Sequence, residues 1–166
     1  MKLKQFAPLL VLLALTACAT PLTPEQQAKA DRMAALSKKI DDNYVPVSYV
    51  SISCSGHTDV PVTGYSVRDL ISTQEYGSGG CGGTVAAGYP LPKQWRPGMK
   101  VKVSWKLDAQ PWRETTTNIM RYDKVGTLFV HVFNDNQVRV VVSNTYPGGA
   151  GHPIPRESKT PPPEEQ

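Results

Sequence analysis

Apolar and polar residues alternate strictly over residues 99–107, and this period of two is typical of a half-buried β-strand. One face of the segment is apolar, with Met99, Val101, Val103, Trp105 and Leu107. The opposite face carries Lys100, Lys102, Ser104 and Lys106. We expect these lysines to form the solvated side of a sheet, and a docking face for an acidic partner is the alternative.

Shorter strand-like patterns fill most of the chain from residue 44 to residue 146. They cover residues 44–54, 60–67, 117–122, 127–133 and 137–143. The segment 127–133 is apolar on both faces, which indicates a central strand, and Asn134–Asn136 predicts a hairpin turn after it. Strands at this spacing predict a mainly β fold over 44–146, a single antiparallel β-sandwich or partly open barrel.

The period changes at the amino-terminal side, where residues 23–43 predict a short helix. Thr23 is suited to the N-cap, Pro24 to the first helical position, and Gln26 to the capping-box position. The apolar stripe is narrow, with Met33, Leu36 and Ile40. We expect this helix to lie on the main domain or to space it from a membrane. A partner-binding or membrane-surface helix is the alternative.

The first 17 residues have the pattern of a secretory signal peptide. Lys2 and Lys4 precede an apolar run over residues 6–15, which is about half the length that a membrane-spanning helix needs. The run ends in Leu15-Thr16-Ala17-Cys18, which resembles a bacterial lipoprotein signal. This resemblance implies that Cys18 is acylated and becomes the mature amino terminus, whereas an ordinary signal followed by a chance cysteine is the alternative.

The residues after Cys18 indicate where such a lipoprotein would reside. Residues 18–22 form a short linker after the lipid anchor, and Ala19 stands where a lipoprotein retained in the inner membrane often carries Asp. The resemblance therefore implies anchoring in the outer membrane, on its periplasmic face. Two acyl signals of this kind hold a protein at a membrane effectively permanently.

Charge gives little support for nucleic-acid binding. The 166 residues include 18 Lys and Arg and 14 Asp and Glu, for a formal charge of +4. Removal of the signal peptide with Lys2 and Lys4 leaves 16 basic and 14 acidic side chains, or +2. A net charge of +2 does not indicate the clustered basic residues that bind phosphate backbones.

The last segment, residues 147–166, is rich in proline and poor in large apolar residues. It holds 6 of the 15 prolines. We expect it to be a disordered tail because it offers little surface to offset its ordering entropy, with a Pro-rich ligand for another domain as the alternative.

Candidate chemistry centres on Cys54 and Cys81. In an oxidising periplasm we expect the two to form a disulfide that pins the glycine-rich run 77–83. A reactive thiol with His57 or His131 as base is the alternative. The glycine-rich run lacks the ending of a P-loop, so its phosphate-binding signal is weak.

A metal site is a further alternative at this motif. The segment Cys54–Asp59 holds a cysteine, His57 and Asp59, and further ligands would have to come from Cys81, His131 and His152. More often, Asp59 would cap a turn and His57 would hydrogen-bond locally. We expect no metal, no other cofactor and no catalytic activity.

Three motifs in this order resemble an uncharacterised domain family of proteobacterial lipoproteins, one of the numbered domains of unknown function. They are Cys54-Ser55-Gly56-His57-Thr58-Asp59, the glycine-rich run with Cys81, and Trp95-Arg96-Pro97-Gly98 leading into the alternating strand. The resemblance extends over residues 44–146. Physically, Arg96–Met99 is also a good type II turn.

Genes of this family often lie beside those of type VI secretion spike proteins and phospholipase effectors. The resemblance therefore implies a periplasmic immunity lipoprotein that binds and blocks a secreted lipase without catalysis. The residues of a partner surface would be His57, Asp59, Trp95 and Arg96. The alternative is an envelope-structural or small-ligand-binding lipoprotein, and an enzyme of unknown type comes third.

Overall fold

The computed structural model describes residues 23–42, 45–70, 74–77, 79–82 and 85–164. The signal peptide, Cys18 and the linker lie outside the described residues. The chain divides into two compact units, Met1–Tyr44 and Val45–Gln166.

The first unit contains helix α1, Pro24–Asp42. It begins with the predicted capping box, because the Gln26 amide donates to Thr23 Oγ1 at 3.3 Å and the Thr23 amide donates to Gln26 Oε1 at 3.0 Å. The predicted helix is therefore confirmed. No helix in the described part of the chain combines the length and apolarity needed to cross a membrane.

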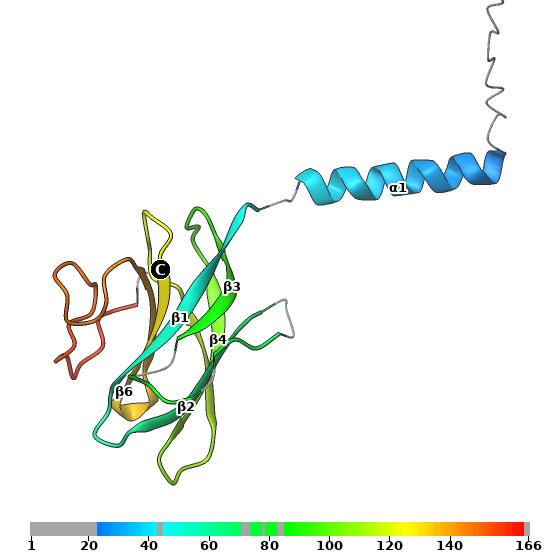
Figure 1. The fold of residues 1–166 in the computed structure, drawn as a ribbon. Coiled ribbons are helices and arrows are strands. Elements are labelled where there is room, and N and C mark those ends of the chain that lie inside the picture. Colours follow the sequence, from blue (N-terminus) through cyan, green and yellow to red (C-terminus); the bar gives the residue numbers. More distant parts are fainter. Residues whose placement is uncertain (1–22, 43–44, 71–73, 78, 83–84, 165–166) are drawn as a thin grey trace, which may run out of the picture. The chain divides into compact units, whose positions relative to one another are not determined.

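The second unit is a sandwich of two sheets (Figure 1). The four-stranded sheet has the order β3 (Ala86–Pro92), β1 (Val47–His57), β6 (Thr127–Phe133) and β7 (Val138–Ser143). The three-stranded sheet has the order β2 (Val62–Asp69), β4 (Lys100–Leu107) and β5 (Arg113–Asn118). The mainly β fold is as predicted, but β1 and β6 pair in parallel, whereas the other paired strands of the described residues are antiparallel.

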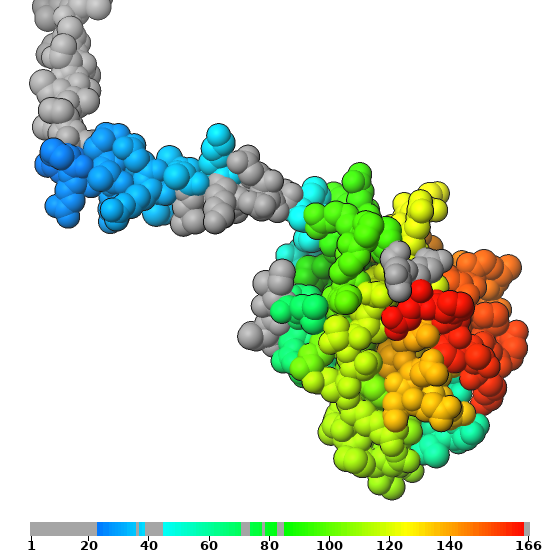
Figure 2. All heavy atoms as spheres, turned by 180° about the vertical axis from the view of Figure 1, so that it is seen from behind, coloured from blue at the N-terminus to red at the C-terminus, as the bar shows by residue number. Residues whose placement is uncertain are grey.

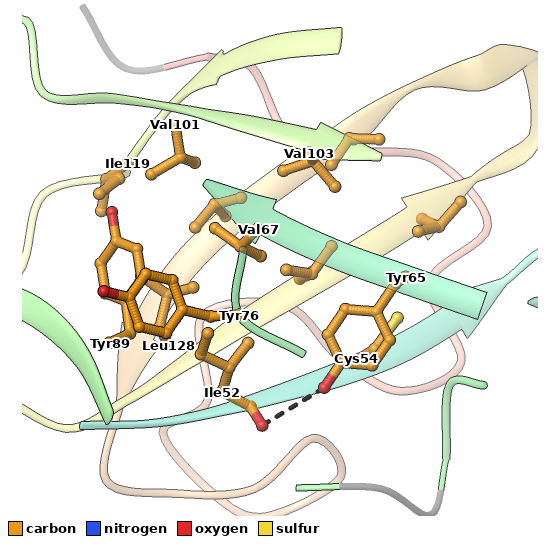
Figure 3. Close-up of a cluster of buried hydrophobic side chains, with 14 of the residues drawn as sticks. Ile52, Cys54, Tyr65, Val67, Tyr76, Tyr89, Val101, Val103, Ile119 and Leu128 are labelled. Carbon is orange, nitrogen blue, oxygen red and sulfur yellow. Dashed lines mark hydrogen bonds between the residues drawn. The ribbon is translucent and has the colours of Figure 1, made fainter. Parts of the chain in front are cut away.

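The main core lies between the two sheets (Figure 3). Ile52 of one sheet and Tyr65 of the other are fully buried there, and the Tyr65 hydroxyl donates to the Ile52 carbonyl at 3.4 Å. The strand β6 is buried on both faces, as its two-sided apolar pattern predicted. Its residues Leu128, Val130 and Val132 face this core.

The two sheets meet at one corner. Beyond β5, the Ile119 amide donates to Met99 O and the Met120 amide donates to Val140 O, both at 2.9 Å. The chain thus passes from the three-stranded sheet to β7 without closing a barrel. The strand expected at 117–122 is instead β5, which starts earlier, at Arg113, and ends at Asn118, just before this crossing.

One strand, β3, has no counterpart among the predicted strands. Its sequence holds Gly88, Pro90 and Pro92, which are poor strand formers. The structure accommodates them because β3 is an edge strand with a break in register between Val50 and Ser51 of β1.

Two turns match their predictions. Asp135 and Asn136 between β6 and β7 have φ values of 58° and 62°, a region that Asp and Asn tolerate better than most residues. Gly98 has a φ of 82°, and the Met99 amide donates to Arg96 O at 3.4 Å, as a type II turn requires.

Residues 144–164, which we call the C-terminal strap, are packed against the four-stranded sheet. The prediction of a disordered tail is wrong for the described part of it, because Ile154 is 1% exposed and packs against Phe129 and Phe133. The strap runs beside β6 in Figure 1 (orange to red). The prediction rested on composition alone and was wrong for two reasons. One buried apolar residue, Ile154, is enough to cover this face of the sheet. The prolines also reduce the conformational entropy that the segment loses on ordering.

The end of the strap is held by polar contacts. Arg139 Nε on β7 donates to Pro162 O at 2.7 Å, and Arg139 Nη1 lies 3.3 Å from Glu164 Oε1. The red end of the strap lies against the yellow-orange strands in Figure 2. Residues 165–166 lie outside the described part of the chain.

Candidate functional site

The predicted disulfide between Cys54 and Cys81 is present, with the two Cα atoms 4.5 Å apart. It fixes the glycine-rich loop to both sheets, because the Gly82 amide donates to Cys54 O and the Cys81 amide donates to Val62 O, each at 3.0 Å. With both sulfurs in this bond, the reactive-thiol alternative has no nucleophile here.

The three histidines of the chain form one hydrogen-bonded row under the strap. His57 Nε2 lies 2.8 Å from His131 Nδ1, and His131 Nε2 lies 3.1 Å from His152 Nε2. His152 Nδ1 lies 2.6 Å from the carbonyl oxygen of Thr145. All three rings are buried, and His131 is 0% exposed. We call this row the histidine chain.

The sheet register places the first two rings on one face. In the parallel β1–β6 pair, Ser55 lies opposite His131 and His57 lies opposite Phe133. Side chains in register on neighbouring strands share a face, so His57 and His131 point away from the main core. His57 stacks on Phe133 with ring centroids 4.5 Å apart. The contact between His57 and His131 could not be predicted from sequence alone, because 74 residues separate them.

The hydrogen-bond partners fix the ring tautomers. A carbonyl oxygen only accepts, so His152 Nδ1 carries a hydrogen that it donates to Thr145 O. The neutral His152 ring then accepts at Nε2 from His131 Nε2–H, and His131 Nδ1 accepts from His57 Nε2–H. His57 Nδ1 is left at the end of the chain, buried and without a hydrogen-bond partner.

The surroundings of the histidine chain favour neutral rings. Burial, together with smaller contributions from the neighbouring His57 and His152, lowers the pKa of His131 to about 3. Burial also lowers the pKa of His57, although the backbone of Ser158 acts in the opposite direction. The pKa of His152 is lowered by burial as well.

This arrangement does not suit a metal ion. A shared ion would need one nitrogen of each ring directed at a common point, whereas His131 turns opposite ring nitrogens to its two neighbours. Across the described ranges, no three His, Cys, Asp or Glu side chains form a group that could hold a metal.

The four residues of the predicted partner surface are not brought together. His57 is buried, and Trp95 is half-buried with its Nε1 donating to Ile119 O at 2.9 Å. Asp59 and Arg96 are exposed. Residue 92 pairs with residue 47 at the start of β1, ten residues before His57, so the Trp95 turn lies about 30 Å from His57 along the strand.

Asp59 takes part in a local contact between loops. It accepts from Asn134 Nδ2 at 3.2 Å, and its own amide donates to Asn134 Oδ1 at 3.3 Å. Lys159 Nζ of the strap lies 3.5 Å from Asp59 Oδ1. Asp59 therefore links the end of β1 to the β6–β7 turn and to the strap.

An exposed face on the three-stranded sheet offers a different surface. As predicted, the lysines of β4 lie on its outer side, since the burial of β4 alternates. Lys102 Nζ lies 2.5 Å from Glu114 Oε1, and this hydrogen bond lowers the pKa of Glu114. We call this surface the basic face, and its charged residues are Arg68, Lys100, Lys102, Lys106 and Glu114.

Trp112 lies at one end of the basic face and was missed in the sequence. Its side chain is 57% exposed, and its Cη2 is 2.8 Å from where a Cβ on Gly64 would lie. The indole thus rests on a glycine and lines a cleft of about 480 Å³ together with Glu75 and Glu114. A signal existed, because Trp112 stands alone among polar residues beside a turn, where no core face requires it.

A second cleft of about 520 Å³ lies where the strap meets β1. Ser53 and Ser55 form its sheet side, and Tyr146, Pro147 and Arg156 of the strap form the opposite wall. The disulfide also lines it. One wall of the cleft therefore depends on the strap.

The comparisons with known proteins confirm the expected domain of unknown function. A family model described as "Protein of unknown function (DUF3304)" matches residues 55–140, just over half of the chain. The match includes His57 at the end of β1 and all of β6, and it stops before the strap. The comparisons with curated proteins and with solved structures found no match. The chain belongs to this DUF3304 family.

Proposed function

We propose that the protein is a lipid-anchored periplasmic inhibitor that binds a secreted lipase effector and blocks it, without a reaction of its own. Cys18 would carry the lipid and hold the domain at the outer membrane. A fixed location of this kind raises the effective concentration of an inhibitor where a lipase attacks. The alternative is an envelope-structural or small-ligand-binding lipoprotein.

The single observation that carries a binding role is the exposed Trp112 on the basic face. Tryptophan and arginine dominate the energetics of protein interfaces, and a large exposed aromatic on a rigid sheet loses little entropy on binding. Trp112 is held in place by its contact with Gly64 and by the neighbouring β5 strand.

Charge indicates the kind of partner that would fit. The basic face carries four cations, whereas the anions close to them are Glu75 and Glu114. Arg68 lies 3.9 Å from both carboxylates, so part of the positive charge is neutralised and part remains. An excess of one sign on a rigid face steers association with a partner of opposite charge. We therefore propose an acidic surface on the lipase.

Binding of the full chain to the proposed partner, a secreted lipase, tests this surface. Trp112→Ala is expected to weaken the binding constant at least tenfold, because a central aromatic anchor contributes about 2 kcal/mol or more. Gly64→Ala is expected to weaken it as well, since the new methyl group displaces the indole.

The matched control is Tyr49→Ala, which removes an aromatic side chain that is 77% exposed on the other sheet. Its affinity should equal that of the unchanged protein, and all variants should melt at similar temperatures. Equal affinity of the Trp112 and Tyr49 variants would reject the basic face as the binding surface.

A further inference from the structure

We propose that the histidine chain is an acid-sensitive clasp: its three neutral rings hold the C-terminal strap on the four-stranded sheet, and protonation in mild acid releases the strap. The chain has three histidines, and all three take part. His57 and His131 belong to the sheet, whereas His152 belongs to the strap. The contact between His131 and His152 therefore joins the two.

The hydrogen-bond pattern limits how many protons the closed clasp accepts. With three neutral rings, the one unused lone pair is His57 Nδ1. A single added proton fits there, beside the backbone of Arg156 and Ser158. A second proton must occupy a nitrogen that now accepts a hydrogen bond, so two N–H groups would face each other and that contact would break.

The charged groups around the clasp do not compensate a second positive charge on its rings. Arg139 on β7 lies opposite His131 in the sheet register, and its own charge is paired with Glu164. Lys159 on the strap lowers the pKa of His57, while Asp59 after β1 is 3.5 Å from that lysine. Strand β6 contributes only Phe129 and Phe133 beside the rings. No carboxylate contacts a ring among the described residues.

In the open form, in which the strap has left the sheet, the number of protons that the rings bind is not limited in this way. Once the strap leaves, each histidine regains its ordinary pKa near 6.5 and binds a proton below that pH. Because the open form then binds more protons than the closed one, acid favours opening. Release would also remove the strap wall of the cleft lined by Tyr146 and Arg156.

Hydrogen exchange of the full chain at pH 7.5 and at pH 5.0 tests the clasp, with protection corrected for the intrinsic effect of pH on exchange. A fall from pH 7.5 to pH 5.0 favours opening about 30-fold for each histidine that is neutral when closed and titrates normally when open. We expect the amides of residues 145–164 to lose about 30-fold of their protection or more. The amides of β4 should stay protected.

Unchanged protection of the strap at pH 5.0 would overturn the proposal. Parallel loss of protection in β4 would also overturn it, since that result means global unfolding rather than release of the strap. His152→Gln removes one titrating ring, so the loss of strap protection between the two pH values should become about 30-fold smaller. An unreduced loss in this variant would speak against the clasp.

A second measurement on the unchanged protein covers the case in which the His152→Gln strap is already open at pH 7.5. Ring nitrogen NMR at pH 7.5 should find the hydrogen on Nδ1 of His152 and on Nε2 of both His57 and His131. Any other set of tautomers, or a His131 ring that titrates near pH 6.5 while the strap stays protected, contradicts the clasp.

Discussion

At the scale of single residues, the most unusual groups are the three buried histidines. Their pKa values lie below the ordinary value of 6.5, with His131 at about 3. A histidine with a lowered pKa in the folded state contributes stability that is complete above pH 6.5 and is lost as the pH falls below it. The protein should therefore be more stable at pH 7.5 than at pH 5.0.

The expected difference is about 2 kcal/mol for each histidine that stays neutral at pH 5.0 in the fold and titrates normally when unfolded. Urea unfolding at the two pH values measures it. A free energy of unfolding that is equal at both pH values, or higher at pH 5.0, would contradict the neutral, buried state of the rings.

A second residue-scale prediction concerns Gly80 in the loop pinned by the disulfide. A Cβ there would lie 2.6 Å from the carbonyl oxygen of Val62. This oxygen belongs to the backbone, so the strand would have to shift at a cost in free energy. Gly80→Ala should therefore lower the free energy of unfolding by about 1–3 kcal/mol. Gly56→Ala is the control, because its nearest neighbour, a Val62 methyl group, is at 3.4 Å. Equal stability of the two variants would argue against this close approach.

At the scale of elements, sequence patterns predicted what depends on local residues and missed what depends on distant contacts. The alternation over 99–107, the two-sided β6 and the turn at Asn134–Asn136 are local signals, and the structure confirms them. The parallel β1–β6 pair and the ordered strap depend on contacts between distant segments. The same reason explains why the histidine chain could not be predicted, although each of its members was considered as a ligand.

The strap gives a prediction at this scale. Ile154 is its one fully buried aliphatic side chain in the described residues, and it packs with Phe129 and Phe133. Ile154→Ala should cost about 2–4 kcal/mol of stability or open the strap, because it removes most of the apolar contact that holds it. Leu70→Ala, at a site that is 58% exposed, should cost less than about 0.5 kcal/mol. Similar unfolding curves for both variants would show that the strap is not held by Ile154.

At the scale of the whole domain, the disulfide joins strand β1 to a loop that is hydrogen-bonded to both sheets. It closes a loop between residues 27 positions apart, and the glycine-rich loop bonds to β1 and to β2. Reduction should lower the free energy of unfolding by about 3–4 kcal/mol. Unfolding in the presence and absence of a reductant measures this, with loss of the bond verified by thiol titration. Identical unfolding curves after complete reduction would contradict the proposed stabilisation by the disulfide.

Among the described residues of the β-rich unit, the histidine chain and the basic face differ in their exposure. The histidine chain is covered by the strap, whereas the basic face with Trp112 is exposed. The proposed inhibitor would need a rigid exposed face, and the β2-β4-β5 sheet offers one that rests on the main core.

The central claim is tested most directly by lipase activity measured at increasing concentrations of the full chain. We predict that the secreted lipase proposed as its partner loses its activity at a one-to-one ratio, and that the Trp112→Ala protein needs at least a tenfold higher concentration. Full lipase activity at a large molar excess of the folded protein would contradict the proposed function.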